Sequence, residues 1–177
     1  MSRRIEVSLL LVLAAVAVAP AARADISLNV EGFGGWQNLQ LSRQSLGNAV
    51  GGSEGTAILG GDLLLVLGGL GAGVAVDKTV SGTAQPWAGS LMGGLLFDLP
   101  LLRIEALGEI GRRGRDFGNL FDSGGATFVG LRPGVSLHIP ASPFRLGVTG
   151  LVRWPTSNGD IGSPDFGIVG KIGFELP

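Results

Sequence analysis

The 177-residue sequence contains no cysteine, no tyrosine and a single histidine. Without cysteine the chain has no disulfide framework, no thiol nucleophile, no Cys-based zinc site and no lipid-modified cysteine of the lipoprotein type. Charge is also scarce, because 15% of the residues are charged and the formal net charge is −1. A chain with so few cations lacks the basic surface that nucleic-acid binding requires, so we expect no nucleic-acid partner.

The N-terminus predicts an export signal. Ser2-Arg3-Arg4 is a short positive segment, residues 9–19 form an uninterrupted apolar run, and Ala22-Arg23-Ala24 matches an A-x-A cleavage site. We expect residues 1–24 to be a signal peptide and residues 25–177 to be the mature domain. Its removal takes away three arginines and one glutamate, which changes the net charge from −1 to −3. A permanent anchor is the alternative, but the run is short for a membrane span.

Glycine, by contrast, is abundant, at 32 of 177 residues in a chain that is 45% hydrophobic. There is no collagen-like period, and glycines inside strands permit tight curvature and close backbone approach. Eight strand-like segments follow the signal, several with clear apolar–polar alternation, and the connections between them are alternately long and short. The expected strands are residues 26–41, 57–67, 72–79, 87–97, 102–111, 126–139, 144–154 and 166–176.

This pattern predicts an all-β fold, an eight-stranded antiparallel up-and-down transmembrane β-barrel. Such barrels have an even number of strands, short periplasmic turns and longer external loops, and about ten residues suffice for a tilted strand to cross the bilayer. The main structural alternative is a transmembrane helix over the apolar residues 63–76. Asp62 breaks the longer apolar span, and four glycines between positions 68 and 73 disfavour a helix, so we expect a hairpin.

Aromatic residues indicate which face of the barrel is outside. Those on the apolar face sit near strand ends, and all three tryptophans are at the long-loop end. Two aromatic rows bordering an apolar band are typical of the girdles at membrane interfaces. The alternative is a soluble barrel with core aromatics. The predicted girdle residues are Trp36, Trp87, Trp154 and Phe166 at the long-loop end, and Phe97, Phe144 and Phe174 at the short-turn end.

The opposite face carries five acids and five bases, which we expect to line the lumen. An eight-stranded barrel is only wide enough for side chains to fill, and buried charges are costly unless paired. The sequence therefore predicts a plug of paired charges. We expect Glu31 to contact Lys171, and Arg132 to be served by Glu105 or Glu109. The predicted lumen residues are Glu31, Asp62, Arg103, Glu105, Glu109, Arg132, Arg145, Arg153, Lys171 and Glu175.

No segment predicts catalysis or a cofactor. His138 and Ser136 share one face of a strand, but no carboxylate is near in sequence to orient the imidazole, and both lie toward the short-turn end. The segment from Gly69 to Gly73 lacks the glycine spacing of a dinucleotide loop and is followed by a strand-like run. We expect a structural histidine and a turn at these places.

The long loops hold two further candidates. Two groups of acidic and amide residues lack the spacing of an EF-hand, so we expect solvated turns and no metal site; they are Asn158, Asp160 and Asp165, and Asp116 and Asp122. Arg112, Arg113 and Arg115 leave the membrane where lipopolysaccharide head groups would lie. A lipopolysaccharide contact is the hypothesis for these arginines, and a solvated charge run is the alternative.

The chain resembles the small eight-stranded outer-membrane barrels of the OmpA and OmpX type. The resemblance extends over residues 25–177 and rests on pattern, including the turn-plus-strand segments DLPLLRIE (98–105) and PFRLGV (143–148). We therefore expect a monomeric, non-enzymatic protein of a Gram-negative outer membrane, structural or surface-interacting in role. Its expected partners are outer-membrane lipid and lipopolysaccharide, with periplasmic chaperones and the barrel-assembly machinery during export.

Two alternatives in other classes stay open at this stage. One is a lipid A-modifying outer-membrane enzyme. The other is a secreted soluble ligand-binding β-barrel of the lipocalin type. An assay of lipid A acyl chains separates the first from a structural barrel, and fractionation separates the second.

Overall fold

The computed structural model describes residues 26–40, 52–115, 117–118, 126–139, 142–157 and 160–177. The elements in these ranges are all strands, and no described helix is long and apolar enough to span a membrane. The predicted signal peptide, residues 1–24, lies outside the described residues. The strands are β1 (Ile26–Gln40), β2 (Ser53–Leu67), β3 (Leu70–Thr79), β4 (Trp87–Asp98), β5 (Leu102–Gly114), β6 (Ala126–His138), β7 (Phe144–Ser157), β8 (Asp160–Ile161) and β9 (Asp165–Leu176).

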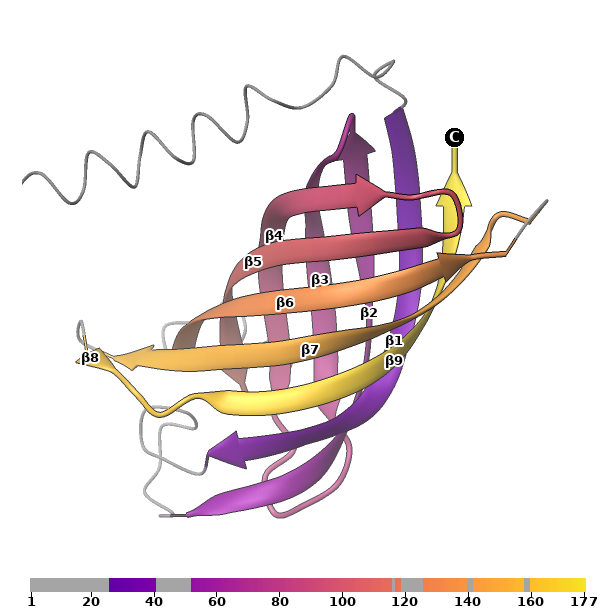
Figure 1. The fold of residues 1–177 in the computed structure, drawn as a ribbon. Coiled ribbons are helices and arrows are strands. Elements are labelled where there is room, and N and C mark those ends of the chain that lie inside the picture. Colours follow the sequence, from indigo (N-terminus) through magenta and orange to yellow (C-terminus); the bar gives the residue numbers. More distant parts are fainter. Residues whose placement is uncertain (1–25, 41–51, 116, 119–125, 140–141, 158–159) are drawn as a thin grey trace, which may run out of the picture.

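The eight long strands form a closed antiparallel barrel (Figure 1). Each strand from β1 to β7 pairs with the next, β7 also pairs with β9, and β9 pairs with β1. The two-residue β8 extends β7 beyond the ring. Closure leaves no free edge in the ring, so ladder partners are available all the way round. The predicted fold class, an eight-stranded antiparallel up-and-down barrel, is confirmed.

The strand register is offset around the ring. Following paired residues from Leu28 on β1 through each strand in turn leads to Phe166 on β9 and back to Asn38 on β1. The circuit therefore returns ten residues further along the starting strand. An offset of this kind fixes the strand tilt, typically about 35–45° in small barrels. The tilt is visible in Figure 1.

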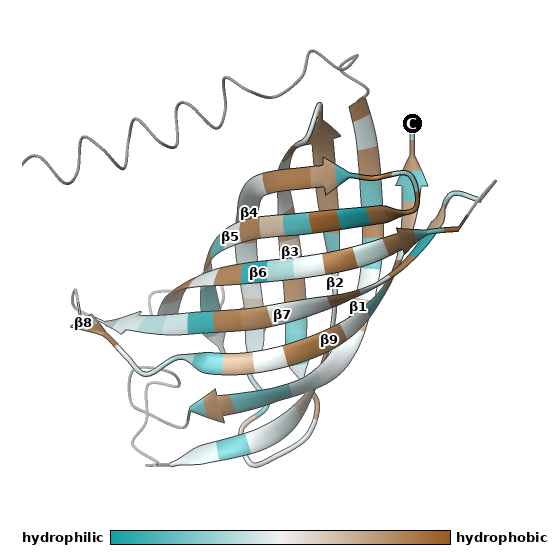
Figure 2. Cartoon of the chain, viewed as in Figure 1, coloured by the Kyte–Doolittle hydropathy of each residue, from teal (hydrophilic) through white to brown (hydrophobic). Residues whose placement is uncertain are grey.

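Side chains alternate strictly between the two surfaces of the barrel. On β1, Ile26, Leu28 and Val30 are exposed, whereas Asn29 and Glu31 are buried. Figure 2 shows the same alternation as brown and paler or teal bands along the strands. Two apolar clusters nevertheless lie inside among the polar groups. They are Leu64, Val66, Ala75, Met92, Leu96 and Leu107, and Phe33, Ile58, Leu151 and Val169.

Residues 63–76 form a hairpin, as the glycine pattern predicts. The chain turns at Gly68 and Gly69, whose φ angles are +53° and +89°, between the paired residues Leu67 and Leu70. Two consecutive positive φ angles match the twist of a two-residue hairpin and favour glycine strongly. The transmembrane-helix alternative is therefore wrong for this segment.

Several strands are longer than expected at the long-loop end. Pairing of β2 begins at Ser53 instead of residue 57, β5 continues to Gly114, and β7 continues to Ser157. These extensions contain many polar residues and glycines, so they lack the apolar alternation on which the boundaries were based. Ladder hydrogen bonding continues there because it depends on the backbone alone.

Candidate functional site

The barrel interior is the most distinctive chemical feature of the protein. Among the described residues, six acids and six bases are buried inside it, so their formal charges cancel. The acids are Glu31, Asp62, Asp77, Glu105, Glu109 and Asp165, and the bases are Arg103, Arg113, Arg132, Arg145, Arg153 and Lys171. The structure places nine of the ten predicted lumen residues in this set, and the tenth, Glu175, also points inward but is partly exposed.

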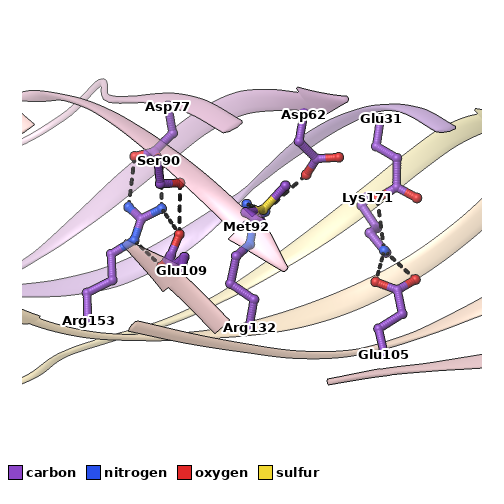
Figure 3. Close-up of polar contacts among 10 residues, drawn as sticks. All are labelled: Glu31, Asp62, Asp77, Ser90, Met92, Glu105, Glu109, Arg132, Arg153 and Lys171. Atoms are coloured by element: carbon purple, nitrogen blue, oxygen red, sulfur yellow. Dashed lines mark hydrogen bonds and ion pairs between the residues drawn. The ribbon is translucent and has the colours of Figure 1, made fainter. Parts of the chain in front are cut away.

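Arg153 is the centre of one cluster of charged side chains (Figure 3). Its Nη1 and Nη2 donate to the two carboxylate oxygens of Asp77 at 3.0 and 2.7 Å, and its Nε donates to Glu109 Oε1 at 2.7 Å. Ser90 Oγ completes the cluster by donating to Glu109 Oε2 at 3.1 Å, and the guanidinium lies 4.9 Å from the Phe128 ring centre. The guanidinium thus joins β3, β5 and β7 across the lumen.

Lys171 forms a second cluster between two carboxylates, visible in Figure 3. Its Nζ lies 2.8 Å from Glu31 Oε2 and 2.6 Å from Glu105 Oε2. Ser136 Oγ donates to Glu105 Oε1 at 3.1 Å. The expected contact between Glu31 and Lys171 is confirmed. It joins the first and last strands, whose pairing closes the barrel.

The partner of Arg132 differs from the one expected from the sequence, so that prediction was wrong. Its carboxylate partner is Asp62, at 3.2 Å from Nη2, and Nη1 also contacts the sulfur of Met92. Glu105 and Glu109 are not the partners of Arg132. Glu105 pairs with Lys171 on β9, and Glu109 pairs with Arg153 on β7. The lumen is narrow enough for side chains to meet across it, so a neighbouring strand does not supply the nearest partner by default.

Two further groups lie toward the ends of the interior. At the short-turn end, Arg103 pairs with Asp98 and lies 3.4 Å from Glu175, which also contacts Arg145 and accepts a hydrogen bond from Ser27. At the long-loop end, Arg113 Nη2 lies 2.7 Å from Asp165 Oδ2.

The sequence analysis did not assign Asp77, Asp98, Arg113 or Asp165 to the lumen. Asp77 shares its inward parity with Ala75 and Thr79, a signal that was available in the sequence. The other three lie at strand ends that were assigned to turns and loops.

Glycines make room for these charged side chains. Gly130 on β6 is the register partner of both Glu109 on β5 and Arg153 on β7, so the ion pair passes over it. A Cβ atom at Gly130 would lie 2.7 Å from Glu109 Oε1. Gly173 is flanked in the same way by Glu31 and Arg145. Part of the high glycine content therefore serves the packing of the interior, in addition to backbone curvature.

A test of the interior compares two hydroxyls on neighbouring strands. Ser136 donates to Glu105, whereas Thr149 Oγ1 is buried with no hydrogen-bond partner among the described residues. We expect Ser136→Ala to lower the free energy of unfolding by about 1.5–3 kcal/mol, since a hydrogen bond to a buried charge is lost. Thr149→Val should leave it unchanged or raise it by up to ~1 kcal/mol. Urea unfolding of both variants in lipid vesicles measures the difference, and equal losses would contradict this account.

Comparison with known proteins rests on structure alone. No protein-family model matches the sequence, and no curated protein matches it. The N-terminal β-barrel domain of Pseudomonas aeruginosa OprF aligns over 85% of this chain and 97% of its own, with a TM-score of 0.61 and 12% identity. Neisserial surface protein A aligns over 84% of this chain and 96% of its own, with a TM-score of 0.54 and 11% identity. The chain has the fold of the small eight-stranded outer-membrane barrels.

The exterior of this outer-membrane barrel fold carries all seven predicted aromatic residues. Trp36 and Phe166 are 50% exposed, and Phe97 and Phe144 are exposed at the opposite end. Trp87, Trp154 and Phe174 also point outward and are partly exposed. Along β1, Val30 is paired with Phe174 and Asn38 with Phe166, eight residues apart. With a rise of about 3.3 Å per residue and a tilt of about 40°, the two rows are separated by roughly 20 Å.

The three arginines proposed to contact lipopolysaccharide do not share one environment. Arg112 points outward and is half-buried, and Arg115 is exposed just beyond β5. Arg113 points into the lumen, is buried, and pairs with Asp165. The lipid-contact expectation is therefore wrong for Arg113, because β5 continues through this position and strand alternation turns every second side chain inward.

The remaining candidates that the structure describes lie in separate contacts. Asp98 Oδ1 lies 3.9 Å from His138 Nε2, so the fold brings a carboxylate near the imidazole although none is near it in the sequence. Ser136, however, donates to Glu105 instead. Of the loop residues considered as metal ligands and expected to form solvated turns, Asp165 pairs with Arg113, and Asp116, Asp122 and Asn158 lie outside the described residues. No group of three potential metal ligands occurs among the residues that the structure describes.

Proposed function

We propose that this protein is a monomeric, non-enzymatic barrel of the bacterial outer membrane, reached through a cleaved signal peptide, with a structural or surface-interacting role. The observation that carries the proposal is the outer surface of the ring. Thirty-one large hydrophobic residues are exposed among the described residues, and those on the ring form an apolar band between the two aromatic rows. Such a band suits the hydrocarbon core of a bilayer and its interfaces.

The same surface argues against a secreted soluble barrel. Leu91 is 63% exposed, Ile110 is 60% exposed, and both point away from the interior. A soluble monomer rarely exposes such a continuous apolar surface. The interior of this barrel is instead occupied by charged side chains and two small apolar clusters, which leaves little space for the apolar ligand of a lipocalin.

The arrangement of His138 argues against a lipid A-modifying enzyme. Its strand end lies at the short turns, which face the periplasm in this proposal, whereas lipid A occupies the outer leaflet. The neighbouring Ser136 hydroxyl is held by Glu105. The partners that this role requires are outer-membrane lipid and lipopolysaccharide, together with chaperones and the barrel-assembly machinery during export.

The lumen is proposed to be closed by its side chains. The clusters around Arg153, Arg132 and Lys171 bridge strands on different sides of the barrel at successive heights. Breaking such pairs to admit water and ions leaves unpaired charges in a narrow space, which is unfavourable. These contacts support a structural barrel in preference to a pore.

Membrane fractionation and gel migration test the proposal together. The protein should be recovered with the outer membrane, and the unboiled form should migrate differently from the boiled form because the closed ladder resists mild detergent. Circular dichroism should show sheet with little helix. Recovery in the soluble or inner-membrane fraction would contradict the location, and large stable conductance in planar bilayers would contradict the closed lumen.

A further inference from the structure

The outer surface of the barrel is almost free of charge, with one local exception. Within the eight long strands as the structure describes them, Lys78 on β3 and Arg112 on β5 are the charged residues that alternate outward. The other charged residues of these strands alternate inward. Both exceptions are cations, and both lie at the long-loop end.

The two cations lie on either side of Trp87, which belongs to the aromatic row at the long-loop end. Lys78 is paired with Trp87 on β4, and Arg112 is paired with Gly89, two residues along the same strand. Lys78 Nζ lies 5.2 Å from the Trp87 ring centre, and the Phe117 ring meets Trp87 edge to face at 5.4 Å. Gly89 lies between its two register partners, Val76 and Arg112, and contributes no side chain to the outer surface there.

The spacing of the two cations suits a ligand with two negative groups. Two strand spacings separate Lys78 from Arg112 across the sheet, and two residues separate them along it. With ~4.8 Å between strands and ~3.3 Å per residue, their Cα atoms are about 12 Å apart at similar height. Both side chains are long enough to move their charged groups several ångströms toward or away from one another.

We propose that Lys78, Trp87 and Arg112 bind the phosphorylated head group of lipopolysaccharide in the outer leaflet. This inference rests on the proposed outer-membrane location. Lipid A bears a phosphate at each end of a glucosamine disaccharide, which matches two separated cations. Arg112 offers a planar fork for one phosphate, Lys78 offers a compact charge for the other, and Trp87 lies at the interface between sugar and acyl chains.

Charge complementarity identifies the occupant. A cation facing hydrocarbon is costly at the bilayer centre and much less so at the interface, where anionic head groups lie. The cross-strand neighbours on the outside, Leu59 beside Lys78 and Thr127 beside Arg112, are uncharged. Two cations beside these uncharged neighbours suit an anionic ligand, and their position beside the long loops corresponds, in the proposed orientation, to the leaflet that contains lipopolysaccharide.

The test measures the thermal stabilisation of the folded full-length mature protein by added lipopolysaccharide in neutral detergent. Each protein is compared with its own melting temperature without lipid, and we expect the double variant Lys78→Gln/Arg112→Gln to bind about tenfold more weakly and to lose most of the stabilisation. The exchanged variant Lys78→Arg/Arg112→Lys should retain it. Trp154→Phe, at the same height on another part of the wall, is the matched control and should also retain it.

Two further ligands separate phosphate recognition from general lipid binding. Dephosphorylated lipid A should stabilise the wild type and the glutamine variant equally, and phosphatidylglycerol should give a smaller difference than lipopolysaccharide. Equal stabilisation of both proteins by intact lipopolysaccharide would overturn the site. If the wild type and the glutamine variant are nevertheless found in the outer membrane, the proposed function stands and only the lipopolysaccharide site is overturned. Recovery of the wild type in another fraction overturns both the proposed function and the site.

Discussion

Replacing Lys171 with methionine should lower the free energy of unfolding by about 3–5 kcal/mol, because two carboxylates are then left in the barrel without their cation. Glu31 and Glu105 both contact Lys171 Nζ within 2.8 Å, and all three side chains are buried. Methionine keeps much of the length and apolar stem of lysine. The loss therefore comes mainly from the uncompensated charge, and urea unfolding in lipid vesicles at neutral pH measures it.

A matched variant shows whether charge is the cause. Lys171→Met combined with Glu31→Gln and Glu105→Gln removes the cation and both anions together, and should recover most of the lost stability. If the triple variant is as unstable as the single one, packing and not charge explains the effect.

Arg153→Met should produce a loss of similar size, about 3–5 kcal/mol, at the other main cluster. The change leaves Asp77 and Glu109 unpaired and removes the guanidinium from the Phe128 ring. Arg153→Lys keeps the positive charge but cannot donate in parallel to both oxygens of Asp77, so its loss should be smaller. The unfolding midpoints of the two variants measure this order.

The matched control for Arg153→Met adds Asp77→Asn and Glu109→Gln, which removes the unpaired charges with little change in volume. This variant should unfold closer to the wild type than Arg153→Met does. A loss from Arg153→Lys as large as that from Arg153→Met would show that charge compensation is not what stabilises this cluster.

Alternation along the strands made much of the architecture predictable. The inward side of β1 follows from the exposed apolar Leu28 and Val30, and the closure of the ring brings β1 next to the last strand. The contact of Glu31 with Lys171 follows from those two facts, since both elements are neighbours and both side chains share one face.

Contacts across the lumen could not be predicted in this way. The partner of Arg132 is Asp62, four strands away around the ring, and the register of neighbouring strands contains no information about which side chains meet across the centre. Arg113 and Asp165 were not assigned to the lumen for another reason. They lie where strands continue beyond the apolar band, so that local composition resembles a loop while the backbone still forms a ladder.

Because the offset around the ring is ten residues in total, the registers of its eight strand pairs depend on one another. A register shift of one residue between two paired strands changes the ten-residue offset of the ring. The first and last strands then no longer pair in register unless another strand pair shifts in the opposite direction. Such a slip also exchanges the two faces of a strand, turning carboxylates toward lipid and leucines toward the lumen. Correct pairing is therefore a property of the whole circle, and we expect partly joined barrels to be poorly populated between the open chain and the closed one.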